Sequence, residues 1–153
     1  MAQATSSHPP AHVAGITVGP EDAAKLLLRV ALGLLVLLHG IGKFNGGIDF
    51  VLAAVSKAGL PPTLAYLAYL VYVGEVLAPL LLIAGAWTRP AAIVVAINMV
   101  VAIALVHAGQ LGSLAPTGGW AIELQALYLV TAVAVALLGA GRFSLARADG
   151  RWN

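Results

Sequence analysis

The sequence predicts an all-α membrane protein, a four-transmembrane-helix bundle with a short amphipathic interfacial helix between its first and second membrane helices. Of the 153 residues, 61% are hydrophobic and only 9% are charged, and the mean hydropathy is +0.97. A soluble domain averages about 45–50% apolar and about 25% charged residues. The chain is therefore too apolar for a surface that faces water, and its length leaves room for one membrane domain and little else.

The first membrane helix is expected over about residues 23–42. Residues 1–20 are small, polar and proline-bearing without apolar periodicity, which predicts a disordered cytosolic tail. The apolar run that follows has no small-residue cleavage site behind it, so it reads as a retained helix and not as a signal peptide. The membrane domain is expected to cover residues 21–145, with residues 146–153 as a second cytosolic tail.

Three further apolar runs predict membrane helices at about residues 63–86, 90–108 and 120–140. Each is long enough to cross a hydrocarbon core of ~30 Å at about 1.5 Å per residue, and glycine and proline break the chain between them. The segment before the second helix carries apolar residues at positions i, i+3, i+4 and i+7, which predicts the amphipathic interfacial helix. These residues are Ile48, Val51, Leu52 and Val55.

The basic residues predict the orientation. Six of them fall on one side of the expected helices and two, Lys43 and Lys57, on the other. Because basic residues concentrate on the cytoplasmic side, this bias predicts that both termini are cytoplasmic. The six are Lys25, Arg29, Arg89, Arg142, Arg147 and Arg151.

The first helix carries Arg29, His39 and Lys43 within the membrane. Each ionisable residue at that depth costs at least ~2.5–3.5 kcal/mol on insertion scales, so each needs a partner or a function. Gly33 and Gly40 flank the line that joins the two basic residues, and small residues let a neighbouring backbone approach closely. We therefore expect this face to point into the bundle.

The second helix carries Glu75, the deepest carboxylate. Pro79 follows four residues later, where its ring crowds the carbonyl of Glu75 and favours a kink. Counting along the helices places Arg29 and Glu75 roughly 9 Å apart in height, which predicts a structural ion pair between them. The alternative for Glu75 is a catalytic role as a group that takes or relays a proton.

A second polar cluster is expected nearer the outer surface, where the depth count brings together residues from helices one, two and four. Each of these residues also has an explanation without a binding role. Lys43 could extend its ammonium group to the membrane boundary, the tyrosines could serve in packing, and Glu123 could be hydrated by water at the membrane interface. Asn98 and His107 are nine residues apart, which puts them on opposite faces of the third helix at about 100° per residue. The candidate ligand-binding residues are His39, Lys43, Tyr69, Tyr72 and Glu123.

The chain has no cysteine, which excludes a disulfide scaffold, a thiol relay, an iron–sulfur cluster and any thiolate metal site. His39 has no second histidine at ligand spacing, so no metal site is expected. Any redox chemistry must use electrons that another group carries. Whether the chain is itself an enzyme stays open, because no site for a redox cofactor of its own is visible.

Several motifs follow one another along the chain: Arg29 and Gly33, His39-Gly40-Ile41-Gly42-Lys43, Glu75, Gly85-Ala86-Trp87-Thr88-Arg89-Pro90, Glu123, and Gly139-Ala140-Gly141-Arg142-Phe143-Ser144-Leu145. In this order and spacing they resemble the DoxX family, from about Glu21 to Leu145. The resemblance implies a four-helix bundle in the bacterial inner membrane, a component of a membrane oxidoreductase, with the thiosulfate:quinone oxidoreductase subunit of the DoxD type among its relatives. It also implies that Arg29, Lys43, Glu75, Arg89 and Glu123 are the family's membrane charges.

The function predicted from these observations is that of an integral membrane subunit of a redox system. It would bind quinone, or a similar hydrophobic ligand, beside a partner oxidoreductase, with the lipid bilayer around it and no role for nucleic acid. A homo-oligomer is compatible with the sequence. The alternatives are a small-solute or proton-coupled transporter module and a structural membrane scaffold.

Overall fold

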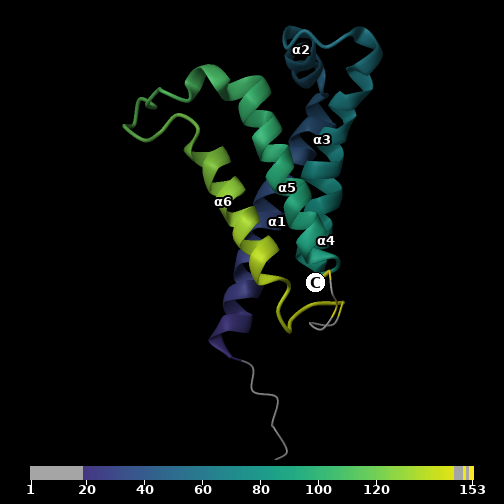
Figure 1. Cartoon of the computed structure of the whole chain (residues 1–153), viewed down its shortest axis with the longest axis vertical. Helices are drawn as coiled ribbons and strands as arrows, with labels where there is room; N and C mark the ends of the chain where they lie inside the picture. Colours follow the sequence, from purple (N-terminus) through teal and green to yellow (C-terminus); the bar gives the residue numbers. More distant parts are fainter. Residues whose placement is uncertain (1–18, 147–149, 151) are drawn as a thin grey trace, which may run out of the picture.

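The computed structural model describes residues 19–146, 150, 152 and 153, and it is all-α over these residues (Figure 1). The second and third long helices are each continuous but include turns of other helix types. The elements are α1 (Pro20–Gly46), α2 (Asp49–Lys57), η1 (Pro62–Tyr69), α3 (Leu70–Tyr72), η2 (Val73–Leu77), α4 (Ala78–Ala84), α5 (Thr88–Ala102), η3 (Ile103–His107), η4 (Ala108–Gln110) and α6 (Glu123–Leu138).

Three of the helical segments are long and apolar enough to cross a membrane. They comprise 27 residues in Pro20–Gly46, 23 in Pro62–Ala84 and 23 in Thr88–Gln110. The fourth, α6, has 16 residues, which is about 24 Å of helix. It is shorter than the expected 120–140 because Trp120 takes part in an isolated β-bridge with Leu114 and Gly139 ends the helix with a φ of 76°. The fold is that of a multi-pass membrane protein.

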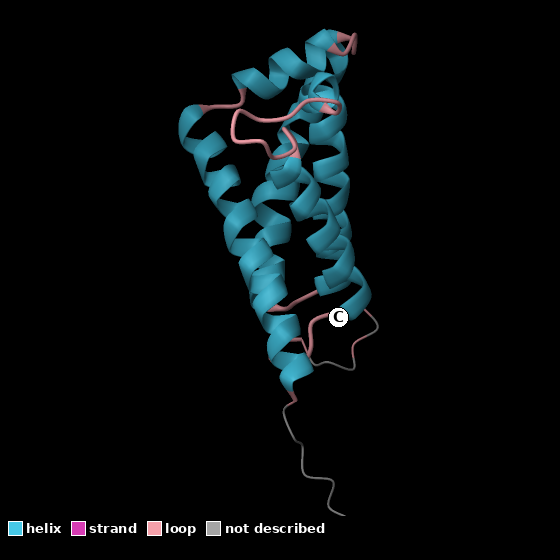
Figure 2. Ribbon diagram, turned by 90° about the vertical axis from the view of Figure 1, so that its left-hand side faces the viewer, coloured by secondary structure: helices cyan, strands magenta, loops and turns pink. Residues whose placement is uncertain are grey.

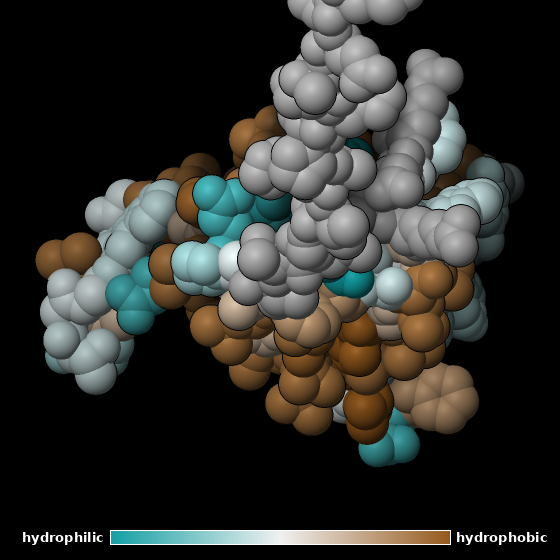
Figure 3. Space-filling view, turned by 90° about the horizontal axis from the view of Figure 1, so that it is seen from below, coloured by the Kyte–Doolittle hydropathy of each residue, from teal (hydrophilic) through white to brown (hydrophobic). Residues whose placement is uncertain are grey.

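The surface agrees with this assignment. Apolar side chains cover much of the outside of the bundle, as Figure 3 shows from below, and single residues such as Leu27 and Leu137 are 70% and 72% exposed. In a soluble protein, continuous apolar surface of this kind would be a liability for aggregation. Here it is the expected surface for contact with lipid tails.

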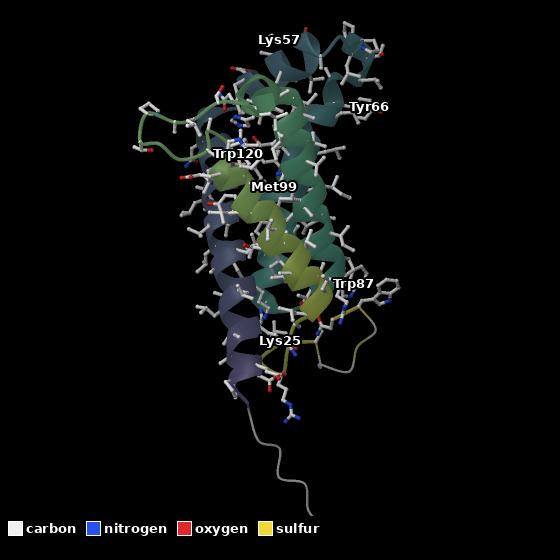
Figure 4. All side chains as sticks on the ribbon, turned by 60° about the vertical axis from the view of Figure 1, so that its left-hand side comes forward. Lys25, Lys57, Tyr66, Trp87, Met99 and Trp120 are labelled. Carbon is white, nitrogen blue, oxygen red and sulfur yellow. The ribbon has the colours of Figure 1, made fainter. Side chains whose placement is uncertain are left out.

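The two ends of the bundle differ. At one end, which we call the near end, lie the start of α1 and the C-terminal segment (Figures 1 and 2). At the opposite end, the far end, α2 and the loop before α6 lie. Figure 4 shows Lys25 and Trp87 toward the near end and Lys57 at the far end.

The expected tails fall mostly outside the described residues. This applies to residues 1–18 and to Arg147 and Arg151, which contributed to the predicted orientation. The described part of the expected C-terminal tail packs on the bundle: the Ala146 amide donates to the Gly85 carbonyl at 3.3 Å, and Asn153 is 7% exposed.

The glycine face of α1 points into the bundle, as predicted. Gly33 and Gly40 are both buried. A Cβ on Gly33 would lie 2.8 Å from Ile83 Cγ1, and one on Gly40 would overlap the main chain of Glu75 and lie 2.7 Å from Val76 Cγ2. The absence of side chains at these two positions is therefore what lets α1 approach η2 and α4 closely.

Substitution of Gly40 by alanine is expected to destabilise the protein by about 1–3 kcal/mol, because the new methyl group forces α1 away from η2. Gly42 is the matched control, since a Cβ there meets no atom within 4 Å. Gly42→Ala should stabilise the helix by about 0.5–1 kcal/mol. Unfolding of each variant in mixed detergent micelles measures both effects, and equal shifts of the same sign would contradict the close contact at Gly40.

The amphipathic helix α2 closes the far end of the bundle. Its apolar face packs on protein, with Ile48 and Val55 buried against Ala68 of η1 and flanked by Val71 and Leu105. A larger core lies toward the near end, where α1, α4, α5 and α6 meet. Its buried residues are Leu32, Val36, Ala78, Leu82, Ala91, Ala92, Val95, Ala132 and Val135.

Candidate functional site

A cavity of about 710 Å³ lies toward the far end, next to the small cluster under α2. Its walls come from α1, α2, the second helix from η1 to η2, the third helix from α5 to η3, and α6. Most of the lining is apolar, with Val36, Val71 and Met99 among its members. The polar and ionisable side chains in the lining are His39, Lys43, Glu75, Asn98, His107, Gln125 and Tyr128.

The most polar part of the lining is a group of three side chains around Glu75. Lys43 Nζ lies 2.5 Å from Glu75 Oε2, and Asn98 Nδ2 donates to Glu75 Oε1 at 3.4 Å. The side chains of Lys43 and Glu75 are 17% and 6% exposed. Each carboxylate oxygen thus has its own donor, and the two charges compensate each other within an apolar environment.

The direction of the helices explains why Lys43 and Glu75 meet. Side chains on a helix lean toward its N-terminus. The first helix runs from the near end to the far end and the second runs back, so Lys43 leans toward the near end while Glu75 leans toward the far end. The two side chains converge although their Cα atoms lie at different heights.

Glu75 lies in a π-helical turn, η2, which ends two residues before Pro79. Proline has no backbone N–H and its ring crowds the carbonyl four residues before it, so a regular α-helix is disfavoured there. The predicted disturbance at Glu75 therefore takes the form of a π turn, a feature often found at functional sites. Gly74 in the same turn lets Asn98 approach, since a Cβ there would lie 2.6 Å from Asn98 Cβ.

The predicted ion pair between Arg29 and Glu75 is wrong. Among the described residues, the ion pairs within 4.0 Å are Lys43 with Glu75 and Arg142 with Asp22. Arg29 leans toward the near end and Glu75 leans away from it, so the two side chains diverge. Heights estimated from the rise per residue do not include the direction in which each side chain leans.

Arg29 instead binds main-chain carbonyl groups at the near end, where it is 1% exposed. Its Nη1 donates to Leu82 O at 2.7 Å and to Ile83 O at 2.8 Å. Its Nε donates to Ala140 O at 3.2 Å, and its Nη2 donates to Phe143 O. The guanidinium thus joins the last turn of α4 to the segment after α6, and its positive charge faces the C-terminal end of α4.

Arg89 also binds main-chain carbonyl groups. Its Nη1 donates to Ala136 O and Leu137 O, both at 3.0 Å, and its Nε donates to Asn153 O at 3.2 Å. The carbonyls belong to the last turn of α6. Two of the membrane charges implied by the family resemblance are therefore caps of helix C-termini.

Two further pairs of polar side chains line the cavity. The His39 and Tyr128 rings lie edge to face with centroids 5.8 Å apart, and Tyr128 Oη lies 3.5 Å from His39 Nε2. His107 Nε2 lies 3.1 Å from Gln125 Nε2, and its Nδ1 lies 2.9 Å from Gln110 Oε1. A neutral His107 with its proton on Nδ1 satisfies both contacts.

Asn98 and His107 both line the cavity, so the prediction that they lie on opposite faces is wrong. The five residues Ile103–His107 form the π turn η3. A π turn holds more residues than an α turn, so each residue advances less around the axis. His107 is thereby rotated back toward the face that carries Asn98.

Three of the five predicted ligand-binding residues lie outside the cavity lining. Tyr69 is 57% exposed and Tyr66 is 62% exposed, because η1 is a 3₁₀-helix in which residues i and i+3 eclipse each other. Tyr72 donates its hydroxyl to Lys43 O at 3.3 Å and so supports the end of α1. Glu123 is exposed in the first turn of α6. His39 and Lys43 do line the cavity.

Sequence reasoning missed Tyr128 altogether and assigned no role to Gln125 or Asn98. Tyr128 is the residue that a helical pattern could have found. It lies one α-helical turn after Leu124 and three residues after Gln125, and all three line the cavity. Gln125 and Tyr128 therefore share one face of α6, which the hydropathy of the segment conceals.

Comparison with known proteins places the chain among membrane proteins of one family. The model of the DoxX family matches residues 24–108. The protein named "Putative oxidoreductase CatD" from Bacillus subtilis (strain 168) is 31% identical over 118 residues, which cover 77% of this chain and 81% of that protein. No solved structure matches. The chain belongs to the DoxX family.

Proposed function

We propose that the protein is a membrane subunit of a redox system and that its cavity binds a quinone, or a similar hydrophobic ligand, beside a partner oxidoreductase. The observation that carries the proposal is the cavity of about 710 Å³ with apolar walls and a few convergent polar groups. Sites for small hydrophobic ligands have volumes of about 300–1,000 Å³ and this mixture of walls. The name of the Bacillus subtilis relative supports a role associated with redox chemistry.

The electrons must come from a partner in this proposal. The chain contains no cysteine, and so it has no thiol pair and no thiolate ligand for a metal cluster. Reduction of a quinone to a quinol consumes two electrons and two protons. The partner would supply the electrons, and the chain would supply the binding site and a route for protons.

Different residues of the cavity lining are assigned to ligand binding and to proton transfer. Lys43 and His39 lie one helical turn apart on α1 and can donate hydrogen bonds to oxygen atoms of the ligand. Glu75 shares its carboxylate between Lys43 and Asn98, and we assign it the role of taking or relaying a proton. Tyr72 acts indirectly, through the Lys43 carbonyl that it binds.

The proposed location is the bacterial inner membrane, with both termini in the cytoplasm. The excess of basic residues at the near end supports this orientation. Lys25, Arg29, Arg89 and Arg142 all belong to segments at that end. Lys43 and Lys57 belong to the far end.

Quinone binding to the purified protein in lipid nanodiscs tests the proposal, with decylubiquinone as the probe. We expect retention of the quinone and a rise in melting temperature, because a ligand that binds only the folded state stabilises it. Ala102→Leu, which narrows the cavity, and Glu75→Gln should each weaken binding by about tenfold or more. Glu123→Gln is the matched control, because this exposed carboxylate lies outside the lining.

Two results would contradict the proposal. One is that the unmodified protein neither retains decylubiquinone nor is stabilised by it. The other is that Ala102→Leu binds the quinone as well as Glu123→Gln does, since binding would then occur outside the cavity. Ala102→Leu keeps Lys43 and Glu75 paired, so a loss of binding in this variant cannot come from an unpaired charge.

A further inference from the structure

A second hollow of about 590 Å³ lies at the far end, between the last turns of α1 and the start of α2. We call it the vestibule. Glycine occupies three of its lining positions, and a Cβ on Gly42 or Gly46 would meet no atom within 4 Å. The lining residues are Leu38, His39, Gly42, Lys43, Gly46, Gly47, Asp49 and Phe50.

The vestibule and the cavity share part of their walls. His39, Lys43 and Phe50 line both. Lys43 Nζ lies 5.8 Å from the centroid of the Phe50 ring, within the range of a cation–π contact. The Phe50 side chain therefore lies at the boundary between the two hollows, next to the ion pair of Lys43 and Glu75.

The two hollows differ in chemistry. The cavity extends between helices among mostly apolar side chains, whereas the vestibule lies where the chain leaves α1. The vestibule has charged side chains and glycines among its lining, beside the apolar Leu38 and Phe50. Asp49 is exposed and begins α2. Ionisable residues within membrane segments face the bundle interior or a water-filled space, and Lys43 lines both the cavity and the vestibule.

We propose that the vestibule is the aqueous entrance to the cavity. Water and small hydrophilic solutes enter from the far end, pass Phe50, and reach the Lys43–Glu75 pair. The inference does not depend on quinone binding, because it concerns the path to the pair and not the ligand beside it.

The natural absence of cysteine makes a direct test possible. Single cysteines are introduced at Gly42 and Gly46, where the added side chain has open space, and exposed to a membrane-impermeant methanethiosulfonate. Only a thiol in contact with water ionises and reacts. We expect both positions to react about tenfold faster or more than the matched control Ile41→Cys, which is 46% exposed on the outside of α1 and lines neither hollow.

The side of access is fixed by a reporter at the opposite end. Glu21→Cys is exposed in the first turn of α1. In sealed vesicles, the reagent should label Gly46→Cys and Gly42→Cys from the side opposite to the one that labels Glu21→Cys. Equal rates at Gly42→Cys and Ile41→Cys, or labelling of Gly42→Cys from the side of Glu21→Cys, would overturn the proposal.

The position of Phe50 has its own test. Ala102 lines the cavity but not the vestibule, so Ala102→Cys reports whether the reagent passes from one hollow to the other. Phe50→Ala should accelerate labelling of Ala102→Cys from the far end, while Phe50→Leu, which keeps an apolar side chain of comparable length, should change it less. No acceleration with Phe50→Ala would overturn the path past Phe50. Melting temperatures identify any variant that fails to fold. If Gly42→Cys is one of them, the labelling rate of Gly46→Cys, which lies outside the close contacts of α1, tests access to the vestibule.

Discussion

Replacement of Arg29 by glutamine is expected to lower the free energy of unfolding by about 3 kcal/mol or more, one of the two largest effects for a single side chain in this protein. The guanidinium is 1% exposed and donates to four carbonyl groups, those of Leu82, Ile83, Ala140 and Phe143. The Leu82 carbonyl keeps the Gly85 amide as a donor at 3.1 Å, but glutamine cannot reach all of the other carbonyls, and each buried acceptor left without a donor costs about 1–3 kcal/mol. Unfolding in mixed detergent micelles measures the loss.

The control for this experiment is another arginine at the same end. Arg142 is in an ion pair with Asp22 at 3.6 Å, and its side chain is 48% exposed. Exposed pairs contribute about 0–1 kcal/mol, so Arg142→Gln should change stability little. Arg29→Lys should recover part of the loss, because an ammonium donates to fewer carbonyls than a guanidinium does. Similar effects for Arg29→Gln and Arg142→Gln would show that the carbonyl contacts do not stabilise the fold.

Removal of either member of the Lys43–Glu75 pair is expected to lower the free energy of unfolding, removal of Lys43 by more than removal of Glu75. Removal of both should cost less than the two single losses combined. A buried ion that loses its partner costs about 3–5 kcal/mol. Lys43→Met should cost about 3 kcal/mol because it strands Glu75, whose side chain is only 6% exposed. Glu75→Gln should cost less, because Lys43 is 17% exposed and borders the vestibule.

A double-mutant cycle separates the pair from its surroundings. The variant with both Lys43→Met and Glu75→Gln contains no stranded charge, so it should be more stable than Lys43→Met alone by about 1 kcal/mol or more. Strict additivity of the two single losses would mean that the residues do not interact in the membrane. A larger loss for Glu75→Gln than for Lys43→Met would contradict the assigned difference in access to water.

The fold is largely predictable from the sequence because the membrane imposes it. Runs of about 20 apolar residues have few alternatives to a spanning helix when every backbone polar group needs a partner within the segment. Gly33 and Gly40 then identify the buried face of α1. The length of α6 was overestimated, because hydropathy does not show that residues before Glu123 form a turn.

The candidate site was harder to predict, because its geometry depends on departures from a regular α-helix. The positions expected from the sequence assume the rise and the rotation per residue of a regular α-helix throughout. The structure contains a 3₁₀-helix that carries Tyr66 and Tyr69 outward, a π turn around Glu75, and a second π turn that brings His107 to the face of Asn98. Only the π turn at Glu75 has a visible cause in the sequence, namely Pro79.

The direction of side chains is a second reason, and it applies to the charges. Sequence separation gave the depth of Arg29, Lys43 and Glu75 but not the way each side chain leans. The first and second membrane helices are antiparallel, so their side chains lean in opposite directions. Lys43 therefore leans toward Glu75, and Arg29 leans away from it. The same rule, applied to the sequence, would have favoured the observed pair.

The contacts of Arg29 have a consequence for how this region tolerates sequence change. All four of its acceptors are peptide oxygens, which every amino acid provides. The residues at positions 82, 83, 140 and 143 can therefore be exchanged for others of suitable size without loss of these bonds. The junction of α4 with the segment after α6 thus depends on one side chain and on main-chain hydrogen bonds such as that from Leu145 N to Ala84 O at 3.1 Å. Its chemistry can therefore persist while the sequences that it joins diverge.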